Sequence, residues 1–449
     1  MTSTMNATNT PRRVYIETYG CQMNQDDSDR ILRLLGDLNY VETKEADDAD
    51  LVLINTCSVR EKPEHKVYSA LGRYKRLKEE RGTIIGVAGC VAQQEGERLL
   101  NRIPYLDLVI GTQAIHLLPQ MLERIEKKER VCETGGDPEG KYLTAPRFRK
   151  PLARVKSYVT IMQGCDHFCS FCIVPYVRGR EKTRPSGEVL EEVRHLADMG
   201  VKEVCLLGQN VNSYGKGVAG ELDFSDLLLR ISEIEGIRRI RFTTSHPQDL
   251  SERLIQAFSK LEKLCEHIHL PFQSGSDRVL KRMHRGYTRA SYLEKVERLK
   301  TICPSIAITG DAIVGFPGEE EEDFEETLAL MKAVQFDDLF SFKYSPREGT
   351  RAAGFEDRVE EKVKQKRLSI LQELQREVTF QKNQALEGQV VEVLVEGRSK
   401  QGDQDVTGRT RSNKIVNFRG DVDVTGHLIP VHITKAYQHS LRGEVVRNS

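Results

Sequence analysis

Short apolar runs alternate with helical patterns through the first third of the chain. The apolar runs lie at residues 14–18, 51–55, 83–89 and 106–111. Between them, stretches such as DRILRLLGDL and VYSALGRYKRLKEE repeat apolar residues at the three- and four-residue spacing of a helix. Because strands that alternate with helices usually pair in parallel, this pattern predicts an open, mostly parallel sheet with helices on both faces.

The same alternation restarts in the middle of the chain, after a segment rich in glycine, proline and basic residues. We interpret that segment, residues 131–150, as a linker. Six further apolar runs follow, at residues 154–163, 201–208, 237–244, 266–272, 306–316 and 337–345. Six strand–helix units predict a partial (β/α)6 barrel, whose functional end is formed by the carboxyl ends of its strands.

The last part of the chain changes character again. A highly charged helix is expected over roughly residues 357–386. Beyond it, short β-branched runs broken by glycine and proline predict a small all-β barrel. The predicted α/β chain thus has domains at residues 12–130, 151–382 and 383–447.

Composition narrows the class of protein. The 449 residues carry 67 basic and 67 acidic side chains, so the net charge of zero argues against indiscriminate binding to nucleic acid or membrane. No apolar run approaches the roughly 20 residues of a membrane helix. The N-terminal segment lacks the apolar core of a signal peptide, so we expect a cytoplasmic protein. In that reducing compartment, ten cysteines indicate metal binding or catalysis rather than disulfides.

The sharpest motif is a C-x3-C-x2-C run formed by Cys165, Cys169 and Cys172. Thiolates are the usual ligands of iron–sulfur clusters, and three of them leave one iron of a four-iron cluster open to another ligand. Two alternatives remain: a zinc site with a fourth ligand such as His167, or three unliganded thiols.

A second group of cysteines is dispersed in the sequence. Cys21, Cys57 and Cys90 each come just after a predicted parallel strand, and glycines precede two of them. Because ligands bind outside the carboxyl ends of parallel strands, we expect these thiols to converge on a metal. The alternative is that they are small buried hydrophobic residues. The other cysteines are interpreted as structural, namely Cys132, Cys205, Cys265 and Cys303.

C-x3-C-x2-C at the mouth of a β/α barrel resembles the radical S-adenosylmethionine superfamily. The resemblance implies that Cys165, Cys169 and Cys172 hold a 4Fe-4S cluster whose open iron binds S-adenosylmethionine. One-electron reduction then cleaves this cofactor to methionine and a 5′-deoxyadenosyl radical. Cofactor contacts are expected at the strand ends, in GQN, HLPFQSGS and DAIVGFPGE, and the residues concerned are Gly208, Gln209, Asn210, Gln273, Ser274, Asp311, Gly315 and Gly318. Basic stretches at residues 178–184 and 281–289 are expected to flank the barrel mouth, with Arg184 the candidate partner of the cofactor carboxylate.

The segments TYGCQMNQDDSDRI, INTCSVREKPEHKVYSALG and VAGCVAQQEGE resemble the amino-terminal domain of the methylthiotransferases, within that superfamily. The resemblance implies a second 4Fe-4S cluster on Cys21, Cys57 and Cys90, from which sulfur is inserted. GCQMN and NTCSVREKP resemble the branch that methylthiolates N6-isopentenyladenosine at position 37 of tRNA, beside the anticodon. Alternatives are the branches acting on a ribosomal-protein aspartate or on threonylcarbamoyladenosine, and a non-catalytic metal-containing RNA-binding protein.

The tail resembles the TRAM domain, an RNA-binding β-barrel. Arg409, Arg411, Lys414 and Arg419 crowd one hairpin with Phe418, and cations beside an aromatic suit a folded RNA. The implied partners are the anticodon stem-loop of tRNA, an electron donor such as a flavodoxin or ferredoxin, and an iron–sulfur assembly or sulfur-carrier protein. We expect a monomer without membrane attachment.

Overall fold

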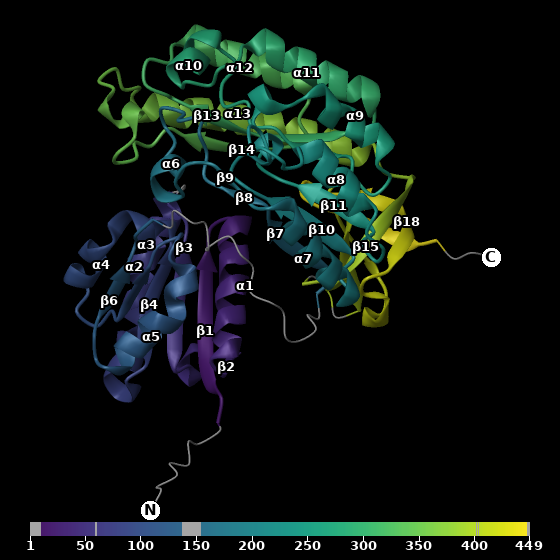
Figure 1. The fold of residues 1–449 in the computed structure, drawn as a ribbon. Coiled ribbons are helices and arrows are strands. Elements are labelled where there is room, and N and C mark those ends of the chain that lie inside the picture. Colours follow the sequence, from purple (N-terminus) through teal and green to yellow (C-terminus); the bar gives the residue numbers. More distant parts are fainter. Residues whose placement is uncertain (1–9, 59–60, 137–153, 401, 403, 447–449) are drawn as a thin grey trace, which may run out of the picture. The chain divides into compact units, whose positions relative to one another are not determined.

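The computed structural model describes residues 10–58, 61–136, 154–400, 402 and 404–446 (Figure 1). The chain forms two compact units. The first takes the N-terminal part of the chain together with Ile173–Arg180, and the second takes the remainder.

The first unit is built on a six-stranded parallel sheet in the order β2-β1-β3-β4-β5-β6. Its strands are β1 (Arg12–Tyr19), β2 (Tyr40–Glu42), β3 (Leu51–Thr56), β4 (Ile84–Gly89), β5 (Leu108–Ile110) and β6 (Val131–Glu133). Its principal helices are α1 (Gln22–Asp37), α2 (Glu61–Arg81), α3 (Cys90–Glu95), α4 (Glu97–Arg102) and α5 (Leu118–Glu126). The predicted open parallel sheet is confirmed, and the short strands β2 and β6 add to the four that the apolar runs predicted.

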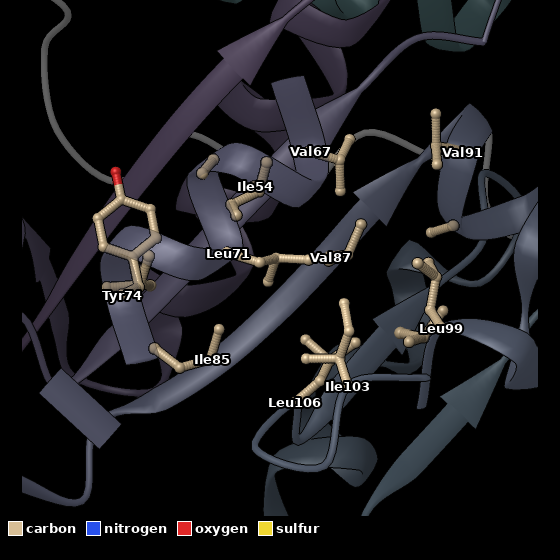
Figure 2. Packing of buried hydrophobic residues seen from close by; sticks show 14 of the residues in the cluster. Ile54, Val67, Leu71, Tyr74, Ile85, Val87, Val91, Leu99, Ile103 and Leu106 are labelled. Carbon is tan, nitrogen blue, oxygen red and sulfur yellow. The ribbon is translucent and has the colours of Figure 1, made fainter. Parts of the chain in front are cut away.

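Both faces of this sheet are buried, because side chains along each strand alternate between two cores. Val52 and Ile54 of β3 face a cluster that also contains Leu71 of α2 (Figure 2). Leu51 and Leu53 face the opposite cluster, to which α1 and α5 contribute. The continuous apolar run of β3 therefore reflects burial on both sides.

The sheet extends beyond residue 130, where the sequence suggested that a linker begins. β6 continues the parallel ladder because Val131 is fully buried and pairs with Leu108 of β5. Residues 137–150, the rest of that predicted linker, lie outside the described residues.

The second unit contains six parallel barrel strands, β7 (Lys156–Thr160), β10 (Glu203–Leu207), β11 (Arg239–Phe242), β12 (His267–His269), β13 (Ala307–Val314) and β14 (Asp338–Lys343). They form two three-stranded sheets, β11-β10-β7 and β12-β13-β14, and a parallel bridge from Ile240 to Leu264 continues from β11 toward the second. The helices are α7 (Ser186–Asp198), α8 (Phe224–Ser232), α9 (Glu252–Lys260), α10 (Asp277–Arg282), α11 (Arg289–Ile302), α12 (Glu321–Val334) and α13 (Glu361–Gln384). The predicted partial (β/α)6 barrel is confirmed.

The C-terminal barrel belongs to the same unit and is closed, in the order β15-β16-β17-β19-β18. Its strands are β15 (Val390–Arg398), β16 (Asp405–Thr410), β17 (Ile415–Arg419), β18 (Leu428–Ala436) and β19 (Leu441–Val445). Valine and isoleucine side chains fill its core together with Phe418. This confirms the small all-β barrel predicted from the β-branched runs.

Buried arginines join this barrel to the β/α barrel. The guanidinium of Arg239, from β11, is fully buried and donates to the carbonyls of Arg409 (2.6 Å) and Glu392 (3.1 Å). Arg241 donates to the carbonyls of Thr410 and Arg411, each at 2.7 Å. Such charge-assisted hydrogen bonds fix the orientation of the two barrels within the unit. In the described part of the chain, no helix combines the length and apolarity needed to cross a bilayer.

Leu71→Ala is expected to destabilise the first unit by about 2–5 kcal/mol, because it leaves a cavity in a fully buried core. Leu38→Ala, at a position 39% exposed, is the matched control and should change stability by less than about 0.5 kcal/mol. Urea unfolding of the apoprotein followed by circular dichroism measures both. Equal effects of the two substitutions would contradict this account of the core.

Candidate metal centres

Three neighbouring strands of the first unit end side by side. Tyr19 of β1 pairs with Thr56 of β3, which pairs with Gly89 of β4. A cysteine follows each strand within two residues, and these are Cys21, Cys57 and Cys90. The structure therefore gathers the three dispersed cysteines at the carboxyl edge of the sheet, as their positions predicted.

Two glycines allow the backbone to approach this edge closely. A Cβ on Gly20, whose φ is +137°, would lie 2.4 Å from Cβ of Cys57. A Cβ on Gly89, with φ +91°, would lie 2.5 Å from the carbonyl oxygen of Thr56. Both positions therefore require glycine, for their backbone conformation and because a Cβ would clash with the neighbouring atoms.

The thiols form one hydrogen-bonded group. The hydrogen bonds with Cys57 lower the pKa of Cys21 to about 7 and that of Cys90 to about 6, against the effect of burial. The same contacts raise the pKa of Cys57 well above its ordinary value. Because thiolates bind iron and two of these thiols are predisposed to lose their protons, this donor set fits an iron–sulfur cluster.

A buried polar network beneath the cysteines fixes the turn that carries Cys21. The side-chain oxygen of Asn24 accepts from the backbone N–H and the thiol of Cys21, at 3.4 and 3.3 Å. The amide of Asn24 donates to the side-chain oxygen of Asn55 and to the carbonyl of Thr56, both at 3.1 Å. Asn55 donates in return to the carbonyl of Asn24 (2.8 Å). Sequence reasoning did not identify Asn24 and Asn55 as members of the site.

A segment from further along the chain completes this edge. Ile173 and Val177, at the ends of α6 (Val174–Val177), pack on Cys90. The hydroxyl of Thr112 donates to the carbonyl of Val177 (2.6 Å), and the amide of Gln113 donates to the next carbonyl (3.1 Å). Residues 173–180 are therefore part of the first unit, although the sequence assigned them to the β/α barrel.

Arg178, at the end of that segment, lies at the cysteine group. Its guanidinium is 3% exposed and donates to Asp27 at 2.6 Å. Its positive charge adds to the Cys57 hydrogen bonds in lowering the pKa of Cys21 and Cys90. From the sequence we expect this arginine to flank the barrel mouth. The structure assigns it to the first unit, and no local sequence pattern indicates that residues 173–180 leave the β/α barrel.

The second cysteine group lies in the loop after β8 (Met162–Gln163). The loop is tied down by backbone contacts, since the N–H of Gly164 donates to Gln209 (2.6 Å) and that of Ser170 donates to the carbonyl of Met283 (2.9 Å). Cys169 is nearly buried, and Cys165 and Cys172 are partly exposed.

The charges around this loop suit a cluster with anionic ligands. The buried guanidinium of Arg285, from the basic stretch 281–289, lies 3.4 Å from the sulfur of Cys169. Burial raises the pKa of Cys165 to about 12, and a neighbouring Cys169 thiolate adds to that rise. The thiol of Cys165 must therefore lose its proton when a metal binds. Three cysteines of one loop beside a buried cation fit an iron–sulfur cluster.

His167 lies inside the motif but its imidazole is engaged elsewhere. Its Nε2 is 2.6 Å from Asp249 and 3.1 Å from the amide of Asn210, and its ring stacks on His246 with centroids 3.7 Å apart. Hydrogen bonds from His167, Asn210 and Lys216 lower the pKa of Asp249 against the effect of burial. His167 is thus held by Asp249 and Asn210 at Nε2, and with His246 and Asp249 it forms a group whose possible ligand atoms lie within 4.8 Å of one another.

Several polar atoms at the strand ends are buried without a hydrogen-bond partner among the described residues. They include the side-chain oxygens of Asn210 and Gln273 and both side-chain atoms of Gln163. Such atoms are costly unless a ligand supplies their partners. S-adenosylmethionine carries an ammonium group, hydroxyls and an adenine, so these residues fit it.

The other predicted cofactor residues have different surroundings. A Cβ on Gly208 would lie 2.4 Å from Met162, and Ser274 is buried in the turn that precedes α10. Asp311 is 3.4 Å from His269 across β12 and β13. Gly315 and Gly318 have positive φ, and their missing side chains leave room for Lys364, Arg282 and Asp357. Contact with the cofactor stays a prediction for all of them.

Arg184 is buried and already paired. Its guanidinium binds Glu192 of α7 and donates to the carbonyl of Thr160 (3.2 Å). An arginine so engaged holds the first barrel strand to α7. A role with the cofactor carboxylate stays a prediction.

Most basic side chains of the hairpin in the C-terminal barrel form ion pairs with carboxylates of the same unit. Arg411 binds Glu266 at 2.7 Å, and Lys414 lies 3.4 Å from Asp337. Arg409 is 3.5 Å from Glu396. Phe418 is fully buried in the barrel core and is not available to stack on a base, contrary to the sequence interpretation. Side chains along β17 alternate between the core and the opposite face, and the strand register directs Phe418 to the core. The sequence alone does not reveal that register.

The remaining cysteines occupy ordinary structural positions. Cys132 lies on β6 and Cys205 on β10, where burial raises the pKa of Cys205 to about 12. Cys265 and Cys303 are buried hydrophobic residues.

Three known families match successive segments of the chain. The family described as Uncharacterized protein family UPF0004 matches residues 13–111. The Radical SAM superfamily matches residues 159–331, and the TRAM domain matches residues 384–446.

Individual relatives match along almost the whole chain. The tRNA-2-methylthio-N6-dimethylallyladenosine synthase of Syntrophus aciditrophicus is 55% identical over 438 residues, which are 97% of this chain and 95% of the relative. The synthase of the same name from Geobacter sulfurreducens is 55% identical over 435 residues, covering 96% and 97%. The solved structure of the radical S-adenosylmethionine methyltransferase TsrM from Kitasatospora setae, with cobalamin and a 4Fe-4S cluster bound, has a TM-score of 0.57 at 15% identity. It covers 76% of this chain and 77% of that chain and supports the fold.

Gly89→Ala is expected to destabilise the first unit by about 1–3 kcal/mol, because the position has positive φ and no room for a Cβ. Displacement of Cys90 should also lower the iron bound per chain. Gly36→Ala in α1, where no atom lies within 4 Å of the added Cβ, should instead stabilise by about 0.5–1 kcal/mol. Urea unfolding and iron analysis test the pair. Similar effects of both changes would refute the close approach at Gly89.

Proposed function

The chain belongs to the family of the tRNA-2-methylthio-N6-dimethylallyladenosine synthases, and from that premise we propose that it methylthiolates N6-isopentenyladenosine at position 37 of tRNA. The reaction replaces the hydrogen on C2 of the adenine by a methylthio group. S-adenosylmethionine serves both as methyl donor and as radical source. The observation that carries the proposal is the full-length likeness at 55% identity, together with two separate cysteine groups that both fit iron–sulfur clusters.

Each cluster is assigned its own set of cysteines. Cys165, Cys169 and Cys172 would hold the cluster that binds S-adenosylmethionine, and the first unit would hold the other on Cys21, Cys57 and Cys90. When bound, these groups supply one-electron reduction of S-adenosylmethionine and a site for the sulfur that is inserted. C2 of adenine is neither acidic nor electrophilic enough for ordinary acid–base chemistry, which explains why such cofactors are used.

The chain's own residues position the cysteines and would bind S-adenosylmethionine. Asn24 and Asn55 hold the turn of Cys21, and the glycines before Cys21 and Cys90 allow close backbone packing at this edge of the sheet. In the second unit the unpartnered side-chain atoms of Gln163, Asn210 and Gln273 would hydrogen-bond S-adenosylmethionine. These contacts provide positioning, which converts a reaction between separate molecules into one within a complex.

On the C-terminal barrel, the proposed contact with tRNA lies outside the basic hairpin, at Tyr437 and Lys435. Tyr437, after β18, is 46% exposed, and the ammonium of Lys435 lies 5.4 Å from its ring centroid. An exposed ring beside a cation suits an unpaired base and its phosphate. Arg411 and Lys414 would instead keep the barrel in place.

The proposal extends to partners that this chemistry requires. An electron donor such as a flavodoxin or ferredoxin would reduce the cluster, and an iron–sulfur assembly or sulfur-carrier protein would replace the sulfur consumed. We expect a monomer that works in the cytoplasm, where its tRNA substrate is found.

A strain lacking this chain should lose 2-methylthio-N6-isopentenyladenosine from its tRNA and accumulate N6-isopentenyladenosine. Mass spectrometry of tRNA nucleosides measures both. Complementation with the unaltered chain should restore the product, whereas Cys21→Ala should not. Normal amounts of the methylthiolated nucleoside in the deletion strain would refute the proposal. Loss of methylthiolated threonylcarbamoyladenosine, or of the modified ribosomal aspartate, would assign the chain to another branch.

Alanine substitution of Cys21, Cys57 or Cys90 should reduce the iron of the anaerobically reconstituted protein from about eight atoms per chain to about four. The variants should still cleave S-adenosylmethionine reductively but form no methylthiolated product. Cys303→Ala, at a buried structural cysteine, is the matched control and should keep all the iron. Loss of cleavage in the first three variants would contradict the division of roles between the two cysteine groups.

A further inference from the structure

Arg178 is a buried cation that the assigned chemistry does not use. Its Nη2 donates to Asp27 at 2.6 Å, but Nη1 is buried and makes no hydrogen bond within the part of the chain that the structure describes. Burying a guanidinium is costly unless its N–H groups find acceptors. The unpartnered Nη1 therefore calls for an anionic partner at this position.

The position of that partner is indicated by the cysteines. Val177, which directly precedes Arg178, packs on Cys90. Asp27, which accepts from Arg178, lies on α1, the helix that begins directly after Cys21. Arg178 and Asp27 thus form an opposed pair of charges beside the ligands assigned to the cluster of the first unit.

Anchoring of the chain segment does not account for this arginine. Thr112 and Gln113 already hold residues 177 and 178 through backbone carbonyls, and Ile173 and Val177 pack on Cys90. A buried ion pair is moreover a weak source of stability compared with apolar packing of the same volume. The charge itself therefore requires an explanation.

We propose that Arg178 is a positioning residue that stabilises negative charge on the cluster held by Cys21, Cys57 and Cys90, and that Asp27 orients its guanidinium and moderates the effect. The inference rests on the proposed assignment of these cysteines as ligands. One-electron reduction of the cluster by an external donor adds one negative charge. A fixed cation in a buried site lowers the free energy of that reduced state and so raises the midpoint potential.

The experiment measures that potential directly. The full-length chain with Cys165→Ala, Cys169→Ala and Cys172→Ala should retain only the cluster of the first unit, and it serves as the parent. Its reduction by sodium dithionite is followed by electron paramagnetic resonance at controlled potential. Arg178→Gln, Arg178→Lys and Asp27→Asn are compared in this background. Lys78→Gln is the control, because Lys78 pairs with Asp107 (2.8 Å), which binds the start of β4 rather than its carboxyl end.

Arg178→Gln should make reduction at least about tenfold less favourable, which is about 59 mV more negative for a one-electron couple. Asp27→Asn should shift the potential in the opposite direction, because it removes the opposing charge. Arg178→Lys should lie between the parent and Arg178→Gln, since it keeps the charge but not the planar fork. Lys78→Gln should leave the potential unchanged.

The opposite signs separate an electrostatic role from a structural one. Both Arg178→Gln and Asp27→Asn break the same ion pair, so a purely structural role predicts shifts in the same direction. That result, or a shift below about threefold for Arg178→Gln, would overturn the proposal. If Arg178→Gln loses its cluster, the sign for Asp27→Asn decides. A parent chain without any iron would instead refute the ligand assignment on which the inference rests.

Discussion

Register between parallel strands is the constraint on which the first unit depends. Tyr19, Thr56 and Gly89 are aligned across β1, β3 and β4, so the chain leaves the sheet three times at one place. β3 is clamped in this register by cores on both faces, and a slip of one residue would exchange those faces. The cysteines that follow these strands are therefore aligned at the same edge of the sheet. Cysteines more than 30 positions apart in the sequence are in this way held at one edge of the sheet.

The second unit relies on a different interaction, in which buried arginines donate to backbone carbonyls. Arg239 and Arg241 reach from the β/α barrel to β15 and to the hairpin after β16, and Arg411 reaches back to the carbonyl of Leu264. Each contact satisfies carbonyls that a joint between two barrels would otherwise bury unpaired. Basic residues at such a joint hold the two barrels together. Side chains that remain exposed are the ones available to contact RNA.

Much of this organisation could be predicted from sequence, because hydrophobic periodicity and cysteine spacing are local signals. They identified the parallel sheet, the six barrel strands and both cysteine groups. What they could not supply was pairing between distant residues. Arg178 and Asp27 are separated by 151 positions, and nothing near either residue reveals the other. The same limit explains Phe418, whose place in the barrel core depends on the register of β17, and the short strand β6, which needs its neighbour β5 to exist.

The return of residues 173–180 to the first unit makes that unit discontinuous in the chain. The backbone passes between the units three times, so no single cut releases an intact N-terminal domain. A fragment ending near residue 130 would lose β6 and expose Cys90 where α6 covers it. Gene fusions or truncations that treat the three domains as interchangeable cassettes would therefore separate a cysteine group from part of its own enclosure. Neither unit is encoded by one continuous stretch of sequence.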